Sequence, residues 1–319
     1  MNKNFQRPIL VIDAMNLFMR HFIANPTMSD HGHHVGGTIG FLKSIRLLTE
    51  RFLPQRIILV WEGGGSLRRR AIFPEYKKGR KPQRLNRFYG DDLPNTVENR
   101  NYQVHLLVEI LKNVPANQMY VSDCEADDAI GYMARYLIDE NKCLIVSSDK
   151  DLYQLLSDDV KQWSPGQKRL ICKEDVLEKF HVSVSNFCLT RCFCGDASDG
   201  IPGIKGAGFR SMAKRFPELA DPAEITLAEI LRLNSQRMQD SKIKLFTEIH
   251  ENYDILERNW KLMNLDTFNL AATQIQKIEF IFNTFDVNKD KISIMRTLLK
   301  EGITSFDVNE FYMALNTLN

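Results

Sequence analysis

The sequence predicts an α/β fold with a mostly parallel central sheet flanked by helices. Short apolar runs alternate with helical patterns over the first half of the chain, which is typical of parallel strands joined by helical crossovers. The apolar character of each run is nearly continuous, as expected for strands that are buried on both faces. The predicted strands are 8–14, 56–62, 117–123 and 143–149, and the predicted helices are roughly 36–53, 96–113 and 125–140.

A second, helical part follows the predicted sheet. From about residue 185 the pattern becomes mostly helical, and Pro202, Pro217 and Pro222 punctuate the transition. The 319 residues are enough for one large domain or two modest ones. We therefore expect an α/β core over 1–185, with a basic arch at about 66–100, and a helical part over 186–319 that packs on the sheet.

The composition excludes several classes of protein. A hydrophobic content of 44% and a charged content of 26% are typical of a soluble globular protein. No apolar stretch approaches the roughly 20 residues of a membrane span, and the apolar N-terminal segment is too short for a secretory signal. The six cysteines form no paired CxxC framework, and Cys188, Cys192 and Cys194 lack a fourth zinc ligand at a usual interval. We expect a monomeric cytoplasmic protein with reduced thiols and no membrane partner.

The distribution of charge is more informative than the net charge of +2. Between residues 68 and 87 a basic block contains a single acid, Glu75. Its cations are Arg68, Arg69, Arg70, Lys77, Lys78, Arg80, Lys81, Arg84 and Arg87. A basic block and a separate cluster of acids fit a protein that holds a polyanion near bound cations.

Acidic residues stand at the end of every predicted strand. Asp13 and Glu62 end the first two strands, Asp123 and then Glu125 follow the third, and Asp149 and then Asp151 follow the fourth. Because parallel strands end at the same edge of a sheet, these side chains are expected to converge there.

Divalent metal ions explain this convergence most simply. Carboxylates are hard oxygen ligands of Mg²⁺, and a pair of such ions can activate water and stabilise the leaving oxygen of a phosphodiester. A single acid at a strand end is more often a helix cap, but that interpretation does not explain five groups at related positions. The candidate ligands are Asp13; Glu62; Glu125, Asp127 and Asp128; Asp149 and Asp151; and Asp196 and Asp199.

Six motifs in a fixed order resemble one known family. They are "LVIDAMNLFMR", "PEYKKGRKP", "CEADDAIG", "IVSSDKDLYQLLSDD", "VKQWSP" and "GDASDGIPGIKGAGFRSMAKRF", and they cover about residues 8 to 216. In these motifs the sequence is similar to the structure-specific 5′-nuclease (flap endonuclease) family. That family includes the 5′→3′ exonuclease domain of bacterial DNA polymerase I and the phage-type 5′-exonucleases and ribonucleases H. The motif "VKQWSP" and the chain length look most similar to the phage-type branch.

The resemblance implies a PIN-like nuclease core and a role for each acid. Asp13, Glu125 and Asp127 would hold a first ion. Asp149, Asp151 and Asp199 would hold a second and share Asp127, while Asp128 and Asp196 would act partly through water. Where most members of the family have an aspartate after the second strand, this chain has Glu62. Its longer side chain moves the carboxylate about one methylene outward, so direct contact of Glu62 with an ion is left open.

The basic block has the composition of a phosphate-binding element, although taken alone it also fits a solubilising surface helix. By resemblance, Lys77 and Arg80 would reach over the scissile phosphate, with Tyr76 beside them, and residues 80–100 would form a helical arch for a single-stranded 5′ end. Arg20 matches a basic position of the family. The predicted DNA contacts in this region are Arg20, Arg68, Arg69, Arg70, Tyr76 and Lys78.

Residues 200–216 read as a helix, a glycine-rich hairpin and a second helix. Gly203, Gly206 and Gly208 permit close approach of the backbone to phosphate, and a helix after them presents free N–H groups. Taken alone this pattern fits an ordinary turn, but it follows Asp196 and Asp199 directly. The resemblance implies a helix–three-turn–helix motif at about 195–216, with Lys205 and Arg210 on phosphate and K⁺ at the hairpin.

These observations predict a nuclease that uses Mg²⁺, with Mn²⁺ as a substitute, to cut 5′ flaps, nicked duplexes or RNA–DNA hybrids. By resemblance it would remove RNA primers or 5′ flaps during replication, with a single-stranded-DNA-binding protein as a candidate partner. One alternative is a DNA-junction-binding protein of the same fold without catalysis. Another is a small-RNA nuclease without the duplex-binding hairpin.

Overall fold

The computed structural model describes residues 7–79, 96–138, 142–284 and 288–318. Its centre is a six-stranded sheet in the order β3-β2-β1-β4-β5-β6. The strands are β1 (Ile9–Asp13), β2 (Arg56–Trp61), β3 (Asn117–Tyr120), β4 (Cys143–Val146), β5 (Val160–Ser164) and β6 (Arg169–Ile171). The first five strands pair in parallel, and only β6 runs antiparallel, against β5. The predicted mostly parallel sheet is confirmed.

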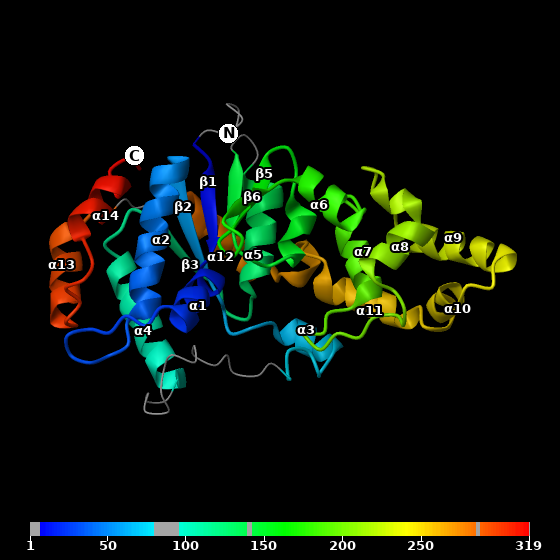
Figure 1. The fold of residues 1–319 in the computed structure, drawn as a ribbon, viewed down its shortest axis with the longest axis horizontal. Coiled ribbons are helices and arrows are strands. Elements are labelled where there is room, and N and C mark those ends of the chain that lie inside the picture. Colours follow the sequence, from blue (N-terminus) through cyan, green and yellow to red (C-terminus); the bar gives the residue numbers. More distant parts are fainter. Residues whose placement is uncertain (1–6, 80–95, 139–141, 285–287, 319) are drawn as a thin grey trace.

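The strands alternate their side chains between two apolar layers. Leu10 and Ile12 of β1 enter one core cluster, whereas Ile9 and Val11 enter the other. The first layer is covered by α1 (Ala14–Ala24), α2 (Gly36–Phe52) and α4 (Thr96–Leu111), and the second by α5 (Ala126–Tyr132) and α12 (Ala272–Asn283) (Figure 1). Burial of both faces explains why the strands read as continuous apolar runs.

The remaining helices extend the molecule on two sides of the sheet (Figure 1). On one side lie α6 (Lys173–Phe180), α7 (Phe187–Cys194), α8 (Phe209–Arg215), α9 (Leu227–Asp240), α10 (Lys244–Glu251) and α11 (Asp254–Met263). On the other side α13 (Lys291–Lys300) and α14 (Val308–Leu315) pack against α4 and α2. The short helix α3 (Leu67–Ile72) lies near α11. The chain therefore returns to the core after its helical middle, and the predicted domain boundary near 185 stays a prediction.

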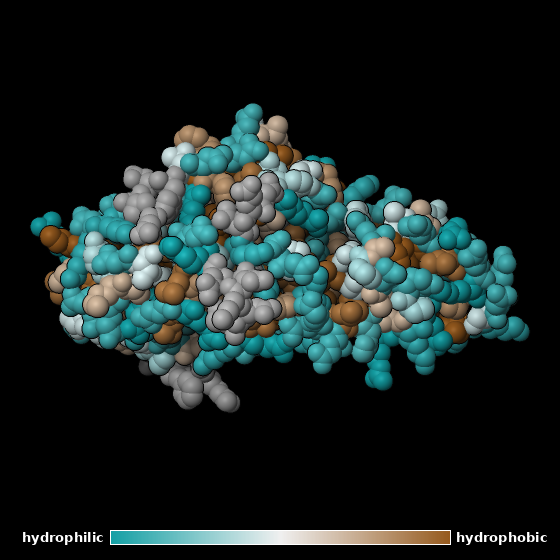
Figure 2. Space-filling model, turned by 90° about the horizontal axis from the view of Figure 1, so that it is seen from above, coloured by the Kyte–Doolittle hydropathy of each residue, from teal (hydrophilic) through white to brown (hydrophobic). Residues whose placement is uncertain are grey.

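Seen from above, the molecule is mostly hydrophilic, with scattered hydrophobic side chains (Figure 2). No helix in the described part of the chain is both long and apolar enough to span a membrane.

The predicted arch at about 66–100 is described only at its ends, because residues 80–95 lie outside the described residues. Arg80 belongs to that undescribed range.

The turn after β2 is held in place by backbone contact with the turn before α5. Gly63 N donates to Cys124 O at 3.0 Å, and Asp123 N donates to Gly63 O at 2.9 Å. A Cβ atom on Gly63 would lie 1.7 Å from Val121 O. This close approach of two backbones fixes Glu62 beside Glu125.

We expect Gly63→Ala to destabilise the protein by about 3 kcal/mol, because backbone atoms cannot move aside as a flexible side chain can. Gly64 is the matched control, since it has a φ of +94° and, among the described residues, nothing within 4 Å of its added Cβ. Gly64→Ala should cost only about 1 kcal/mol of backbone strain. Urea unfolding measures both values, and equal losses would contradict the steric explanation.

Candidate active site

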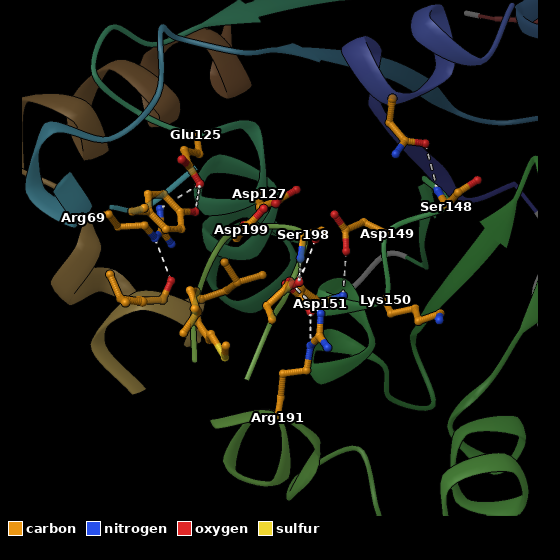
Figure 3. Close-up of a pocket in the computed structure, with 17 residues that line it drawn as sticks. Arg69, Glu125, Asp127, Ser148, Asp149, Lys150, Asp151, Arg191, Ser198 and Asp199 are labelled. Atoms are coloured by element: carbon orange, nitrogen blue, oxygen red, sulfur yellow. Dashed lines mark hydrogen bonds and ion pairs between the residues drawn. The ribbon is translucent and has the colours of Figure 1, made fainter. Parts of the chain in front are cut away.

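A cleft of about 320 Å³ lies at the carboxyl edge of the parallel strands (Figure 3). Asp13 ends β1, and Asp149 follows β4, which pairs with β1. Glu125 and Asp127 lie at the start of α5, and Asp196 and Asp199 follow α7. Six of the nine predicted acids line the cleft, namely Glu125, Asp127, Asp149, Asp151, Asp196 and Asp199, whereas Asp13, Glu62 and Asp128 are not among its lining residues. The fold therefore brings these segments together at one cleft, as the strand-end pattern predicted.

Asp13 and Asp149 are fixed by hydrogen bonds between neighbouring strands. Asp13 Oδ1 caps α1 by accepting from Asn16 N at 3.0 Å, and its Oδ2 accepts from Ser147 Oγ at 3.1 Å. The buried Gln162 on β5 donates to Ser147 O at 2.8 Å and to Asp149 O at 2.7 Å. Asp13 is thus a helix cap, as strand-end acids often are, and its role as a metal ligand stays a prediction.

Glu125 is held by three donors on one of its two oxygens. Its Oε2 accepts from Tyr76 OH at 2.9 Å, from Lys77 Nζ at 2.8 Å and from Arg69 Nη1 at 3.3 Å. Its Oε1 is buried and has no hydrogen-bond partner among the described residues. Burial alone would raise the pKa of Glu125, but Lys77 and Arg69 bring that pKa below its ordinary value. One oxygen atom of Glu125 is therefore left over for a further ligand.

The structure corrects two predicted DNA contacts. Arg69 is only 1% exposed, and its guanidinium donates to both oxygens of Asp128, at 2.5 and 2.7 Å. Tyr76 is 5% exposed and bonded to Glu125. Both side chains are turned toward buried carboxylates at the wall of the cleft rather than toward the outer surface. A run of cations shows that the segment is basic but not which of its members point inward.

Arg191 on α7 is a site residue that the sequence analysis missed. Its Nε donates to Asp151 at 2.9 Å and its Nη2 to Asp196 at 2.7 Å (Figure 3). The only available signal was indirect, because acids this crowded require a cation among them. Arg191 thus joins two acids whose segments are far apart in the sequence.

The electrostatics separate the acids into two groups. Burial raises the pKa of Asp13 to about 7, with repulsion from Asp149 and Glu62 adding to the effect. Burial and the charges of Asp149 and Asp13 likewise raise the pKa of Asp127. By contrast, hydrogen bonds from Ser198 and the charge of Arg191 lower the pKa of Asp196 against the effect of burial. Asp13 and Asp127 therefore lack sufficient positive charge nearby, whereas Asp196 has it in Arg191.

The donor set fits a hard divalent cation. It consists of carboxylate oxygens, one of which is the unpartnered Oε1 of Glu125, and it includes acids whose ionisation is opposed by their neighbours. As the side chains stand, no three His, Cys, Asp or Glu residues among those described lie close enough to share one metal ion. Arg69, Lys77 and Arg191 stand among the acids instead. The division of the acids between two ions stays a prediction.

Glu62 and Lys77 are not among the residues that line the cleft, but both contact the start of α5. Glu62 is exposed, and its Oε2 accepts from Ala126 N at 3.4 Å. Lys77 has a φ of 57°, and its N donates to Asp199 O at 2.9 Å, while its Nζ is 3.9 Å from Asp199 Oδ2. The backbone of the basic segment is therefore attached directly to one of the predicted metal ligands.

The glycine-rich hairpin lies next to this cleft. Asp196 and Ile201 form an antiparallel bridge, and a Cβ on Gly203 would lie 2.3 Å from the Cys194 carbonyl carbon. The first helix of the predicted motif is α7, which ends before residue 200, so the prediction of a helix at the start of 200–216 was wrong. The second helix, α8, is confirmed.

The other predicted DNA contacts are on the surface. The side chains of Arg20, Arg68, Arg70, Lys78, Lys205 and Arg210 are exposed, as are Gly206 and Gly208, and Gly203 is half-buried. Arg70 donates to Gly64 O and Lys78 to Glu75, so these two are partly engaged within the protein.

Residues 8–181 match the family model described as the 5′-3′ exonuclease, N-terminal resolvase-like domain. The chain belongs to the 5′-3′ exonuclease family. A 5′-3′ exonuclease of Buchnera aphidicola is 27% identical over 302 residues, covering 93% of this chain and 94% of the relative. The flap endonuclease Xni of Shewanella halifaxensis is 31% identical over 221 residues, covering 66% of this chain and 79% of the relative. The family predicted from the motifs is confirmed.

Solved structures show the same fold. A bacteriophage T5 flap endonuclease, in a complex with DNA and metal ions, has a TM-score of 0.72 at 21% identity, covering 86% of this chain and 98% of its own. The catalytic core of Rad2 in complex with DNA substrate has a TM-score of 0.54 at 13% identity, with 99% and 93% covered. At these identities the likeness concerns the fold of this 5′-3′ exonuclease family member.

The raised pKa of Asp13 has a consequence for stability. Folding lifts this pKa from 3.8 to about 7, so the folded protein holds a proton that the unfolded chain releases between these values. Its contribution to stability therefore falls as pH rises through this window. Asn at this position cannot ionise and can still cap α1.

We expect Asp13→Asn to stabilise the protein in EDTA at pH 8 by about 2 kcal/mol. The difference from wild type should shrink as pH falls from 7 toward 3.8, because the folded protein then keeps its proton on Asp13 and no longer carries a buried charge there. Urea unfolding across this pH range is the measurement. A less stable Asp13→Asn variant at pH 8 would contradict the assigned cost of burying an ionised Asp13.

Proposed function

We propose that this chain is a metal-dependent 5′-nuclease that hydrolyses phosphodiesters at the 5′ end of duplex or flap DNA and of RNA–DNA hybrids, leaving 5′-phosphates. The observation that carries the proposal is the cleft itself. Acids from separate segments line it, the pKa values of Asp127 in the cleft and of Asp13 at the adjoining strand end are raised, and an exposed hairpin and exposed cations lie beside it. Membership of the 5′-3′ exonuclease family supports the same reaction.

The carboxylates would hold two divalent ions, Mg²⁺ or Mn²⁺. Asp13, Glu125 and Asp127 are proposed for one ion, and Asp149, Asp151 and Asp199 for the other, with Asp127 shared. Asp128 and Asp196 would contribute through water, since Arg69 and Arg191 already engage them. When bound, such a pair activates a water molecule and neutralises the leaving oxygen. The metal ions of the T5 enzyme support this proposal.

Two cations of the chain act on the reacting region. Lys77 Nζ lies 2.8 Å from Glu125, where an ammonium group opposes charge that builds on phosphoryl oxygens. Arg191 orients Asp151 and Asp196 toward the same cleft. Arg80 is proposed to assist Lys77.

The hairpin is proposed to bind the duplex through its backbone, without reading the base sequence. Lys205 and Arg210 are exposed beside it and would contact phosphates, with K⁺ as a proposed ligand of the hairpin carbonyls. Arg20, Arg68, Arg70 and Lys78 offer further exposed cations. A single-stranded-DNA-binding partner, a monomeric state and a cytoplasmic location stay predictions. No observation favours a catalytically inactive junction-binding protein.

The reaction is tested with a 5′-labelled flap duplex, a nicked duplex and an RNA–DNA hybrid. Mg²⁺ should support cleavage of at least one substrate and EDTA should abolish it. Absence of cleavage of all three substrates in Mg²⁺ and in Mn²⁺ would refute the proposed function.

We expect Asp149→Asn to lower single-turnover cleavage by at least about 100-fold, because it removes a proposed ligand of a divalent ion. DNA affinity in EDTA should change little. Asp158→Asn is the matched control, since Asp158 is exposed outside the cleft and pairs with Lys173. Equal rates for Asp149→Asn and wild type would contradict the role of Asp149.

A further inference from the structure

Helix α11 lies between the hairpin and the carboxylate cleft and is bonded to both. It packs against α7, which precedes the hairpin, and against α3, which precedes Lys77. Two of its residues, Asn259 and Leu262, are 0% and 2% exposed. Asn259 makes hydrogen bonds to the hairpin side, and Leu262 makes one to the carboxylate side. They are three residues apart, so they lie on neighbouring turns of one helix face.

Asn259 contacts the hairpin side. Its Nδ2 donates to Cys192 O at 2.8 Å and to Pro202 O at 2.9 Å. The amide is oriented by Arg258, whose Nη2 donates to Asn259 Oδ1 at 2.9 Å. One side chain thus joins the end of α7 to the segment that enters the glycine-rich hairpin.

Leu262 contacts the carboxylate side through its backbone. Its carbonyl accepts from Arg69 Nε at 2.7 Å, and the same guanidinium holds Asp128 and Glu125. Arg69 can make these contacts together because its planar group presents several donors in fixed directions. The position of Glu125 is therefore set with reference to α11.

An apolar cluster covers both sets of hydrogen bonds. Leu262 and Met263 of α11 pack with Tyr76, Cys192 and Ile201, which belong to the basic segment, α7 and the hairpin. Arg258 lies over the Phe73 ring at 4.6 Å and adds a contact to the basic segment. The three parts of the site are thus packed on one helix.

We propose that α11 fixes the distance between the duplex-binding hairpin and the cleft, and so determines which phosphodiester is cut, with Asn259 and Arg69 as its positioning residues. This inference rests on the proposed function. Successive phosphates of one strand rise by about 3.4 Å along the duplex axis. A small displacement of the hairpin relative to the cleft is therefore enough to present a neighbouring phosphate.

The test is the position of the first cut in a 5′-labelled flap duplex, read at single-nucleotide resolution under single-turnover conditions. Wild type should give one dominant product. Asn259→Leu removes both hydrogen bonds to the hairpin side and should distribute the cut over two or more adjacent phosphodiesters. Arg69→Lys keeps the charge but cannot reach all its partners, and it should spread the products in the same way.

Glu257→Gln is the matched control, because Glu257 is exposed on the same helix, and it should give the wild-type product. Circular dichroism and a melting curve establish that each variant is folded. If Asn259→Leu does not fold, Asn259→Ser, which retains one donor, takes its place. Folded variants that cut only at the wild-type position, whether fast or slowly, would overturn the inference. A wild-type chain that cuts nothing would instead defeat the proposed function.

Discussion

Burial of carboxylates at one sheet edge, reinforced by their mutual repulsion, is the constraint on which the rest of this structure depends. Parallel strands end at a common edge, so Asp13 and Asp149 approach each other there, and α5 adds Glu125 and Asp127. Burial removes the solvent that would screen these charges. The raised pKa values of Asp13 and Asp127 record the free energy that this arrangement costs. Such a site is tolerated because the apolar layers on both faces of the sheet stabilise the fold independently of it.

The cations around the acids join separate segments of the chain through ion pairs. Arg69 and Lys77 connect the basic segment to α5, and Arg191 connects α7 to the segment after β4. A buried charge pair of this kind is strongly destabilising to break, because one charge is left without compensation. Through Arg69 the same network reaches α11 and, by way of Asn259, the hairpin. The residues that compensate the acids are therefore also the ones that we propose to align DNA with the cleft.

The sequence predicted the parts that depend on local periodicity and missed those that depend on packing. Four strands and three helices were predicted close to their observed bounds, because continuous apolar runs and helical spacing are local signals. The strands β5 and β6 were not predicted, although they form a local antiparallel pair. The bridging roles of Arg191 and Asn259 left no local signal, since their partners Asp151 and Cys192 lie far away in the chain. Three consecutive arginines, 68 to 70, look alike in sequence, yet only Arg69 is buried. Its direction follows from where Asp128 lies, which no periodicity reveals.

Calorimetric titration with Mn²⁺ in two buffers of different ionisation enthalpy tests the central claim most directly. With pKa values of about 7 at Asp13 and about 6 at Asp151, cation binding at pH 6.5 must displace protons from the cluster. The account predicts net proton release at pH 6.5 that is smaller at pH 8.5, where Asp13 and Asp151 are already ionised. Mn²⁺ binding without proton release at pH 6.5 would contradict it, because the buried carboxylates would then already be ionised before the ion binds.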